Sequence, residues 1–291
     1  MRLEQPFRSQ NILDTNVSRE TFWFTDSMIE LTREVRFAIP STRFARTVER
    51  LANSWSGSAS DNLIRPMVAL QVTVAGELDS KSSYICNIKL IDDLVMQRIV
   101  NRLQPQSECT QRAQNLLDFA AHELQLHLPP SLTLRKVALH LNPQIVFAWQ
   151  QGDTVMLTYS EQFEFSAAHR LHNPNLSDEE NLALFGKCNH ISGHGHNYVV
   201  DVTLVKHQAA SDFDVRAFQT IVRQQVIDRL DHKHLNCDVA AFRELNPSVE
   251  NIAKTIFDWL KEPLKPQKLH GVRVYETPKT WADYFGQDNV M

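Results

Sequence analysis

Apolar and polar residues alternate with a period of two in several short segments of the chain. Successive side chains of a strand point to opposite faces, so this alternation predicts strands with one buried face. The predicted strands cover residues 31–40, 69–76, 136–143, 159–168, 199–206 and 271–278.

Other segments have apolar residues at helical spacing, which predicts amphipathic helices. Two of these helices end alike, in IVNRLQ at 99–104 and in VIDRLD at 226–231. A second helix is predicted after each of them, at 113–124 and at 249–260.

The order strand, strand, helix, helix, strand therefore occurs twice, and a short final strand is expected in each half. The second series follows at an offset of about 127–135 residues. The shared order of elements favours an internal duplication over a chance repetition of common amphipathic patterns. We expect two domains, residues 1–150 and 151–291, that meet at the polar stretch Gln151-Gly152-Asp153.

A strand pair followed by two helices favours the α+β class over a doubly wound parallel sheet, in which strands and helices alternate. We expect each domain to be an antiparallel four-stranded sheet with two helices on one face. Such a sheet leaves its edges open, and open edges are usually covered or paired. Edge-to-edge association into barrels, and hence a homo-oligomer, is expected.

Composition narrows the class of protein. The 291 residues are 43% hydrophobic and 22% charged, with a formal net charge of -4, so no basic nucleic-acid-binding surface is expected. No apolar run has membrane-spanning length, and the first ten residues lack the apolar core of a secretory signal. The four scattered cysteines form no CxxC pair, which favours a reducing, cytoplasmic location without a membrane partner.

Nine of the twelve histidines lie beyond residue 150, so chemistry is expected in the second half. His194 and His196 flank the small Gly195 at the start of a predicted strand and share one face of it. His169 ends the preceding strand and can join them if the two strands pair. Three histidines with an open fourth position are typical of catalytic zinc, whereas an HxH pair by itself can also be a surface or hydrogen-bonded core pair.

The 24 residues between His169 and His194 form a long loop, and loops of this length are more often functional than not. Cys188 in this loop could act as a thiolate base near Zn²⁺ and Lys187, or could be a small buried apolar residue. His172 and His190 are alternative ligands whose spacing gives no reason to prefer them.

Three further carboxylates have both functional and structural interpretations. Asp231 and His232 could orient each other for proton transfer, or could end a solvated helix. Glu276, in a largely apolar strand, either faces solvent or receives N–H groups of a ligand. Glu250 opens the helix at 249–260, where Asn246 or Ser248 could cap and Glu250 could complement the helix dipole.

Five segments of the second half together resemble the 6-pyruvoyltetrahydropterin synthase family, which includes 6-carboxytetrahydropterin synthase. The resemblance covers about residues 155–285 and implies the tunnelling fold, whose units assemble edge to edge into barrels. The segments are FEFSAAHRL, FGKCNHISGHGHNYVVDV, LDHKHLN, NPSVENIA and VRVYETP.

The resemblance also implies roles for individual residues. By this resemblance His169, His194 and His196 are expected to bind Zn²⁺. Cys188 matches the catalytic base, and Asp231 with His232 matches a partner pair that typically reaches the site from a neighbouring unit. Glu276 matches the anchor of the pterin ring, and Glu250 an auxiliary contact in a motif that here has Val249 in place of a frequent threonine.

The family's substrate is 7,8-dihydroneopterin triphosphate, and the product is either 6-pyruvoyltetrahydropterin or, on the route towards queuosine, 6-carboxytetrahydropterin. Five residues separate Cys188 from His194, a spacing that resembles the pyruvoyl branch, but both products stay open. A non-catalytic zinc- or pterin-binding module and another tunnelling-fold enzyme, such as a cyclohydrolase-like hydrolase, are the alternatives.

The first half lacks every one of these motifs. Ser41 falls near the position of His169, and Pro66-Met67 near the start of the HGH strand. Gln104-Pro105 replaces Asp231-His232, and Leu141 or Asn142 replaces Glu276. We expect this half to bind neither zinc nor pterin and to serve as a degenerate structural repeat.

Overall fold

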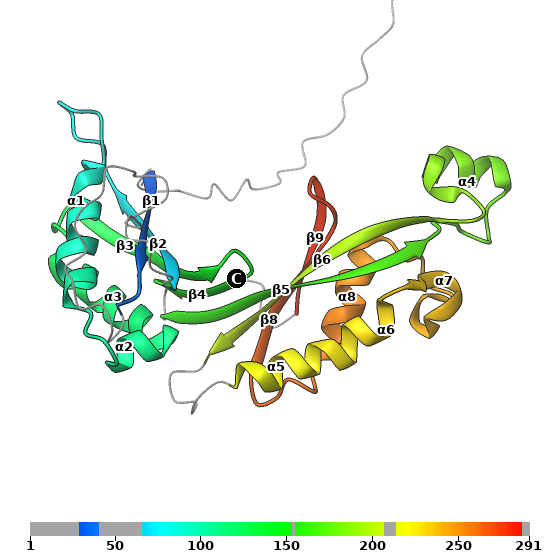
Figure 1. Ribbon diagram of the computed structural model, residues 1–291. Helices are drawn as coiled ribbons and strands as arrows, with labels where there is room; N and C mark the ends of the chain where they lie inside the picture. The colour runs from blue at the N-terminus through cyan, green and yellow to red at the C-terminus, as the bar shows by residue number, and fades with distance from the viewer. Residues whose placement is uncertain (1–28, 41–65, 153–154, 207–213, 287–291) are drawn as a thin grey trace, which may run out of the picture.

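The computed structural model describes residues 29–40, 66–152, 155–206 and 214–286. In these residues nine strands form one sheet with the order β1-β2-β3-β4-β5-β6-β8-β9, and β7 pairs with β5 off this path (Figure 1). The strands are β1 (Ile29–Ala38), β2 (Met67–Gly76), β3 (Leu132–Asn142), β4 (Ile145–Gln150), β5 (Met156–His169), β6 (His194–Lys206), β7 (Lys233–His234), β8 (Lys268–Thr277) and β9 (Thr280–Phe285).

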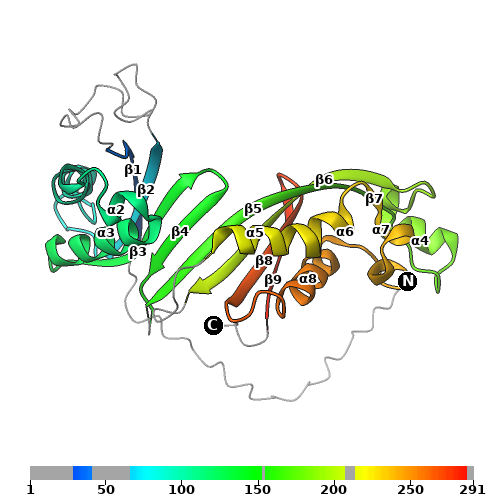
Figure 2. The same cartoon turned by 60° about the horizontal axis from the view of Figure 1, so that its bottom comes forward.

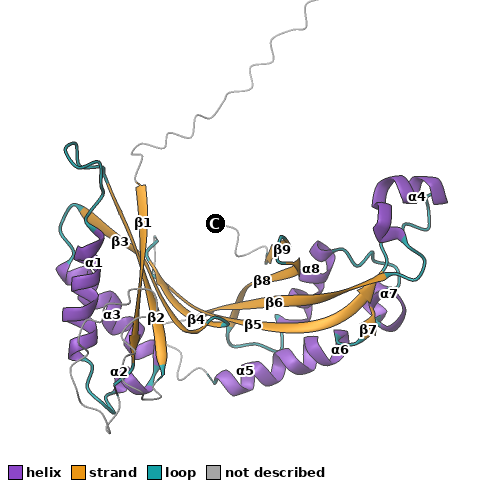
Figure 3. Cartoon of the chain, turned by 45° about the horizontal axis from the view of Figure 1, so that its top comes forward, coloured by secondary structure: helices purple, strands orange, loops and turns teal. Residues whose placement is uncertain are grey.

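The helices cover the outer side of a strongly bent sheet, and α4 projects beyond the far ends of β5 and β6 (Figures 2 and 3). The described helices are α1 (Ile88–Leu94), α2 (Glu108–Gln111), α3 (Ala113–His127), α4 (Asp178–Phe185), α5 (Val215–Val222), α6 (Asp228–Leu230), α7 (Leu235–Asp238) and α8 (Val249–Leu260). The predicted strand and helix order and the α+β class are thus confirmed. None of the helices in the described ranges is both long and apolar enough to cross a membrane.

Burial follows the sequence pattern. In β6 the side chains of Tyr198, Val200 and Val202 are fully buried under the helices, because every second residue of a strand faces the same side. Helix α8 buries a complementary stripe, and the hydroxyl of Ser248 accepts a hydrogen bond from the backbone N–H of Asn251 at its start. The buried residues form two apolar cores, one in each half, and Phe147 packs against both.

The halves join through their strands. The last strand of the first half, β4, pairs antiparallel with β5 from Ile145 opposite Glu161 to Gln150 opposite Met156. The rings of Phe147 and Tyr159 meet across this joint with centroids 4.9 Å apart. The four-stranded sheets of the two halves are therefore parts of one continuous sheet, since the pairing of neighbouring strands runs through both halves without a break.

The halves also share unusual local features. A π-helical segment continues α1 at Val95–Ile99 and continues α5 at Arg223–Ile227, and such segments are rare in proteins. Side-chain hydroxyls join the first two strands of each half, Thr32 to Thr73 at 2.8 Å and Ser160 to Thr203 at 2.9 Å. The short parallel strand β7, in contrast, occurs only in the second half of the described chain, and no sequence pattern predicted it.

Candidate metal centre

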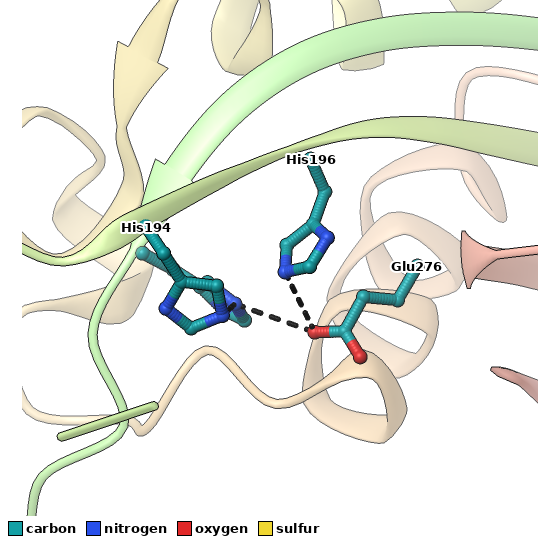
Figure 4. Close-up of side chains that lie close together, drawn as sticks. His194, His196 and Glu276 are labelled. Atoms are coloured by element: carbon teal, nitrogen blue, oxygen red, sulfur yellow. Dashed lines mark hydrogen bonds and ion pairs between the residues drawn. The ribbon is translucent and has the colours of Figure 1, made fainter. Parts of the chain in front are cut away.

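Three predicted metal ligands come together where β5 ends and β6 begins. His169 lies directly opposite His194, and Ala167 lies opposite His196, so all three imidazoles face the helix-covered side. Glu276 reaches the same place from β8, since it lies two residues beyond Val274, the partner of Val200 on that face. Figure 4 shows the side chains of His194, His196 and Glu276 pointing toward one another.

The distances fit a shared cation. The Nε2 atoms of His169 and His194 are 3.1 Å apart, and Oε1 of Glu276 lies 3.3 Å from Nε2 of His169 and 3.4 Å from Nε2 of His196. One ligand atom of each of the four residues lies within 4.8 Å of all the others. Two nitrogens bound tetrahedrally at zinc distances are about 3.3 Å apart, so this donor set suits Zn²⁺.

Hydrogen bonding and burial prepare the imidazoles for a metal. Nδ1 of the fully buried His169 lies 2.7 Å from the carbonyl oxygen of Pro247, to which its N–H can donate, so Nε2 keeps its lone pair for the cluster. Burial lowers the pKa of both His169 and His194, and the neighbouring His196 lowers that of His194 further. Nε2 of His196 is buried without a hydrogen-bond partner in the described structure, as expected of a ligand atom.

The loop that carries Cys188 is held in place by polar contacts. The buried side chain of Asn181 accepts from the N–H of Asn173 and donates to carbonyl groups of the same loop. Arg170 donates from Nε to the carbonyl oxygen of Asn189 at 3.0 Å. The loop therefore has a defined shape around the half-buried Cys188.

Cys188 lies in a short 3₁₀ segment, and its carbonyl oxygen accepts a hydrogen bond from the N–H of Leu171. The thiol is close to the cluster in the chain but is not one of the four converging groups. His172 lies 3.0 Å from the side-chain oxygen of Asn189 through Nδ1, and His190 is exposed. Neither of these alternative ligands joins the cluster.

Asp231 and His232 form a pair at the outer edge of β5, the edge away from β6. The Asp231 carboxylate accepts from the N–H of Ser166 and lies 2.8 Å from Nδ1 of His232. These contacts, first that with Ser166 and then that with His232, lower the pKa of Asp231. The pair is not part of the cluster, but His232 and His196 line the same cavity of about 550 Å³.

Glu250 is exposed in the first turn of α8 and lies outside the converging group. The cap of this helix is Ser248, whereas the side-chain oxygen of Asn246 accepts from the N–H of His172. The structural interpretation of this segment thus holds, and the substrate contact of Glu250 stays a prediction.

The sequence did not reveal two contributors to the site. Tyr198 is fully buried beneath His169 and His196, with ring centroids 6.0 and 5.5 Å away, and burial strongly raises the pKa of its hydroxyl. The carbonyl group of Pro247 orients His169 across 78 positions of the chain. The i+2 relation of Tyr198 to His196 was an available signal, but no spacing rule points to Pro247.

Comparison with known proteins gives one consistent result. A family model described as 6-pyruvoyl tetrahydropterin synthase matches residues 158–287. The chain is 41% identical to 6-pyruvoyl tetrahydrobiopterin synthase of Drosophila melanogaster over 140 residues, covering 47% of this chain and 82% of that protein. It is 40% identical to the Homo sapiens protein of the same name over 131 residues, covering 44% and 90%.

Among solved structures, Caenorhabditis elegans 6-pyruvoyl tetrahydropterin synthase matches with 37% sequence identity and a TM-score of 0.41. The match covers 45% of this chain and 96% of that one.

The crowded glycine beside the cluster is Gly193, not Gly195. Gly193 has φ +69°, and a Cβ there would lie 2.7 Å from the carbonyl oxygen of His169, whereas a Cβ on Gly195 meets only Ala167, at 3.6 Å. We expect Gly193→Ala to lower the free energy of unfolding by about 1–3 kcal/mol and metal affinity by roughly tenfold or more. Gly195→Ala is the matched control and should change neither. Urea unfolding and metal titration measure both, and equal behaviour of the two variants would contradict the assignment.

Proposed function

The chain belongs to the 6-pyruvoyl tetrahydropterin synthase family, a family of lyases, and from this premise we propose that it converts 7,8-dihydroneopterin triphosphate into 6-pyruvoyltetrahydropterin with the help of Zn²⁺. The observation that carries the proposal is the convergence of His169, His194, His196 and Glu276 within 4.8 Å. The names of the relatives and the five residues between Cys188 and His194 favour the pyruvoyl product.

The metal would be held by His169, His194 and His196, with the Nε2 atoms of His169 and His194 3.1 Å apart and Nε2 of His196 beside Glu276. A bound Zn²⁺ would polarise a side-chain oxygen of the substrate and make the adjacent C–H groups more acidic. His169 is fully buried, whereas His194, His196 and Glu276 are partly exposed, so a substrate could reach the cluster from their side.

The protein groups around the cluster have separate tasks in this proposal. Cys188 removes a proton from the substrate side chain. Asp231 holds His232 through Nδ1, so that Nε2 of His232 can exchange protons in the cavity that it shares with His196. Glu276 accepts the N–H groups of the pterin ring, and Glu250 assists at the start of α8. Loss of triphosphate completes the conversion.

The first half, residues 1–150, is proposed to be a second, degenerate unit of the same tunnelling fold, and residues 151–291 the catalytic unit. Shared element order, the paired π-helical segments and the equivalent hydroxyl contacts support this. Pro66-Met67 and Gln104-Pro105 supply no imidazole or carboxylate at the corresponding places, while Ser41 lies outside the described residues. The half would therefore extend the sheet, and copies of the chain would assemble through sheet edges into barrels.

Mass spectrometry of the product tests the function. With 7,8-dihydroneopterin triphosphate and Zn²⁺ we expect 6-pyruvoyltetrahydropterin and free triphosphate. Cys188→Ala should lower kcat by about 10²–10⁴ with unchanged metal content, and the exposed Cys237→Ala is the matched control. Formation of 6-carboxytetrahydropterin would place the chain on the queuosine route, binding without turnover would indicate a binding module, and formate release from GTP a cyclohydrolase-like enzyme.

Glu276→Gln separates two roles of this carboxylate. As the anchor of the pterin ring, it loses charge-assisted hydrogen bonds, and kcat/KM should fall about 10–100-fold while each chain still binds one metal ion. Measuring the metal content of this variant together with its kinetics distinguishes a pterin anchor from a metal ligand. Loss of the metal from this variant would place Glu276 among the ligands instead.

Residues 151–291 expressed alone test the role of the first half. Without β4, residues Met156 to Glu161 of β5 lose their partner strand, and Phe147 no longer contacts Tyr159. We expect a fragment with altered assembly and lower activity, as judged by light scattering and the same product assay. A fully active and normally assembled fragment would refute the structural role.

A further inference from the structure

The short segment 170–172 joins the metal cluster to the loop that carries Cys188. It begins directly after His169, whose imidazole is one of the four converging groups. The backbone N–H of Leu171 donates to the carbonyl oxygen of Cys188 at 2.9 Å, so the backbone at the thiol is tied to the segment at the ligand. A displacement of this segment would therefore disturb the ligand and the thiol together.

Two further contacts run from this segment to Asn189, the residue after Cys188. The side chain of Arg170 donates from Nε to the carbonyl oxygen of Asn189 at 3.0 Å. Nδ1 of His172 lies 3.0 Å from the side-chain oxygen of Asn189, to which its N–H can donate. His172, which is not among the converging groups, thus helps to hold the loop that carries Cys188.

The same segment is held from the other side by Asn246, which lies shortly before α8. The side-chain oxygen of Asn246 accepts a hydrogen bond from the backbone N–H of His172 at 3.2 Å. The next residue, Pro247, has the carbonyl oxygen that lies 2.7 Å from Nδ1 of His169. Two consecutive residues therefore hold both ends of the stretch 169–172, one through its side chain and the other through its backbone.

Helix α8 gives these two residues a fixed position. Ser248 supplies the cap of the helix, so the side chain of Asn246 is not needed for capping. The carbonyl oxygen of Asn246 accepts from the backbone N–H of Ser248 at 2.8 Å and from the side chain of Asn251 at 2.9 Å. Pro247 is buried, and its ring fixes the φ angle of the turn. The two acceptors are therefore positioned by the helix and not by the loop.

We propose that Asn246 is a positioning residue that links the metal cluster to the loop of Cys188, so that a cation bound by His169 also restrains Cys188. This link rests on the roles proposed above for the metal and for Cys188. A cation at Nε2 of His169 fixes the ring that Pro247 holds through Nδ1. Coupling between two sites is reciprocal, so loss of the link should both loosen the loop and lower metal affinity.

Hydrogen exchange of backbone amides, followed by mass spectrometry, tests the link without the pterin substrate. In the unmodified full-length chain, saturating Zn²⁺ is expected to slow exchange of the fragment 185–192 about tenfold, although none of the four converging residues lies in it. In Asn246→Ala the acceptor for the N–H of His172 is lost, and the slowing by Zn²⁺ should largely disappear at the same metal content.

Two further variants separate the link from general damage to the loop. Asn246→Asp keeps an oxygen acceptor at the same place and should retain the slowing. Asn173→Ala is the matched control, because it removes another side-chain acceptor of this loop, the one for the N–H of Asn175 at 3.0 Å, and it should also retain the slowing. Urea unfolding of the metal-free variants measures their global stability.

Two more measurements have values that a merely structural role would not give. Metal titration should show an affinity about tenfold lower for Asn246→Ala than for Asn246→Asp or Asn173→Ala. With the proposed substrate and saturating Zn²⁺, kcat of Asn246→Ala should fall about 10–100-fold with little change in KM, because the thiol is displaced while the bound ring is not.

Equal slowing by Zn²⁺ in the unmodified chain and in Asn246→Ala, or slowing in neither, overturns the proposal. Loss of the slowing in Asn173→Ala as well also overturns it, since it indicates general loosening of the loop. If Asn246→Ala does not fold, Asn189→Ala interrupts the link at its other end and is judged by the same outcomes. Exchange and metal titration do not use the pterin, so their failure leaves the proposed reaction to its product assay.

Discussion

The antiparallel ladder between β5 and β6 is the constraint on which the rest of this structure depends. It runs without interruption from Leu157 opposite Lys206 to His169 opposite His194. A shift of one residue would turn every side chain of one strand to the other face. The large buried residues Phe165 and Tyr198 exclude such a shift, because they stack on each other at 4.9 Å under the helices. The apolar core therefore determines the geometry of the imidazoles.

The cluster places polar side chains next to this apolar core, which lowers the free energy of unfolding. Of the three imidazoles and the carboxylate only His169 is fully buried, but the buried Nε2 of His196 has no hydrogen-bond partner in the described structure. Unpaired buried polar groups of this kind are destabilising unless a ligand satisfies them. A cation among them would offset that cost, so the same atoms that weaken the empty fold would stabilise the loaded one.

The two halves correspond in their scaffold and differ in the residues of the metal cluster, all four of which lie in the second half. Their strand order, their π-helical segments and the contacts between their first two strands correspond. They differ in the four cluster residues, and within the described ranges the second half also has the additional elements α4, α7 and β7. A half without the histidine cluster can thus keep its place in a shared sheet, because the ladder depends on backbone groups and on the buried face.

The sequence by itself determined the elements, their order and the α+β class, because the period of two in Val200 to Leu204 and the helical period in α8 reflect burial that each segment carries locally. It also determined that His194 and His196 share a face. Only the tertiary structure decided that Glu276 joins them, that Pro247 orients His169, and that β4 continues into β5. These contacts depend on strand neighbours and register, which side-chain periodicity leaves open, since many partners can bury the same alternating face.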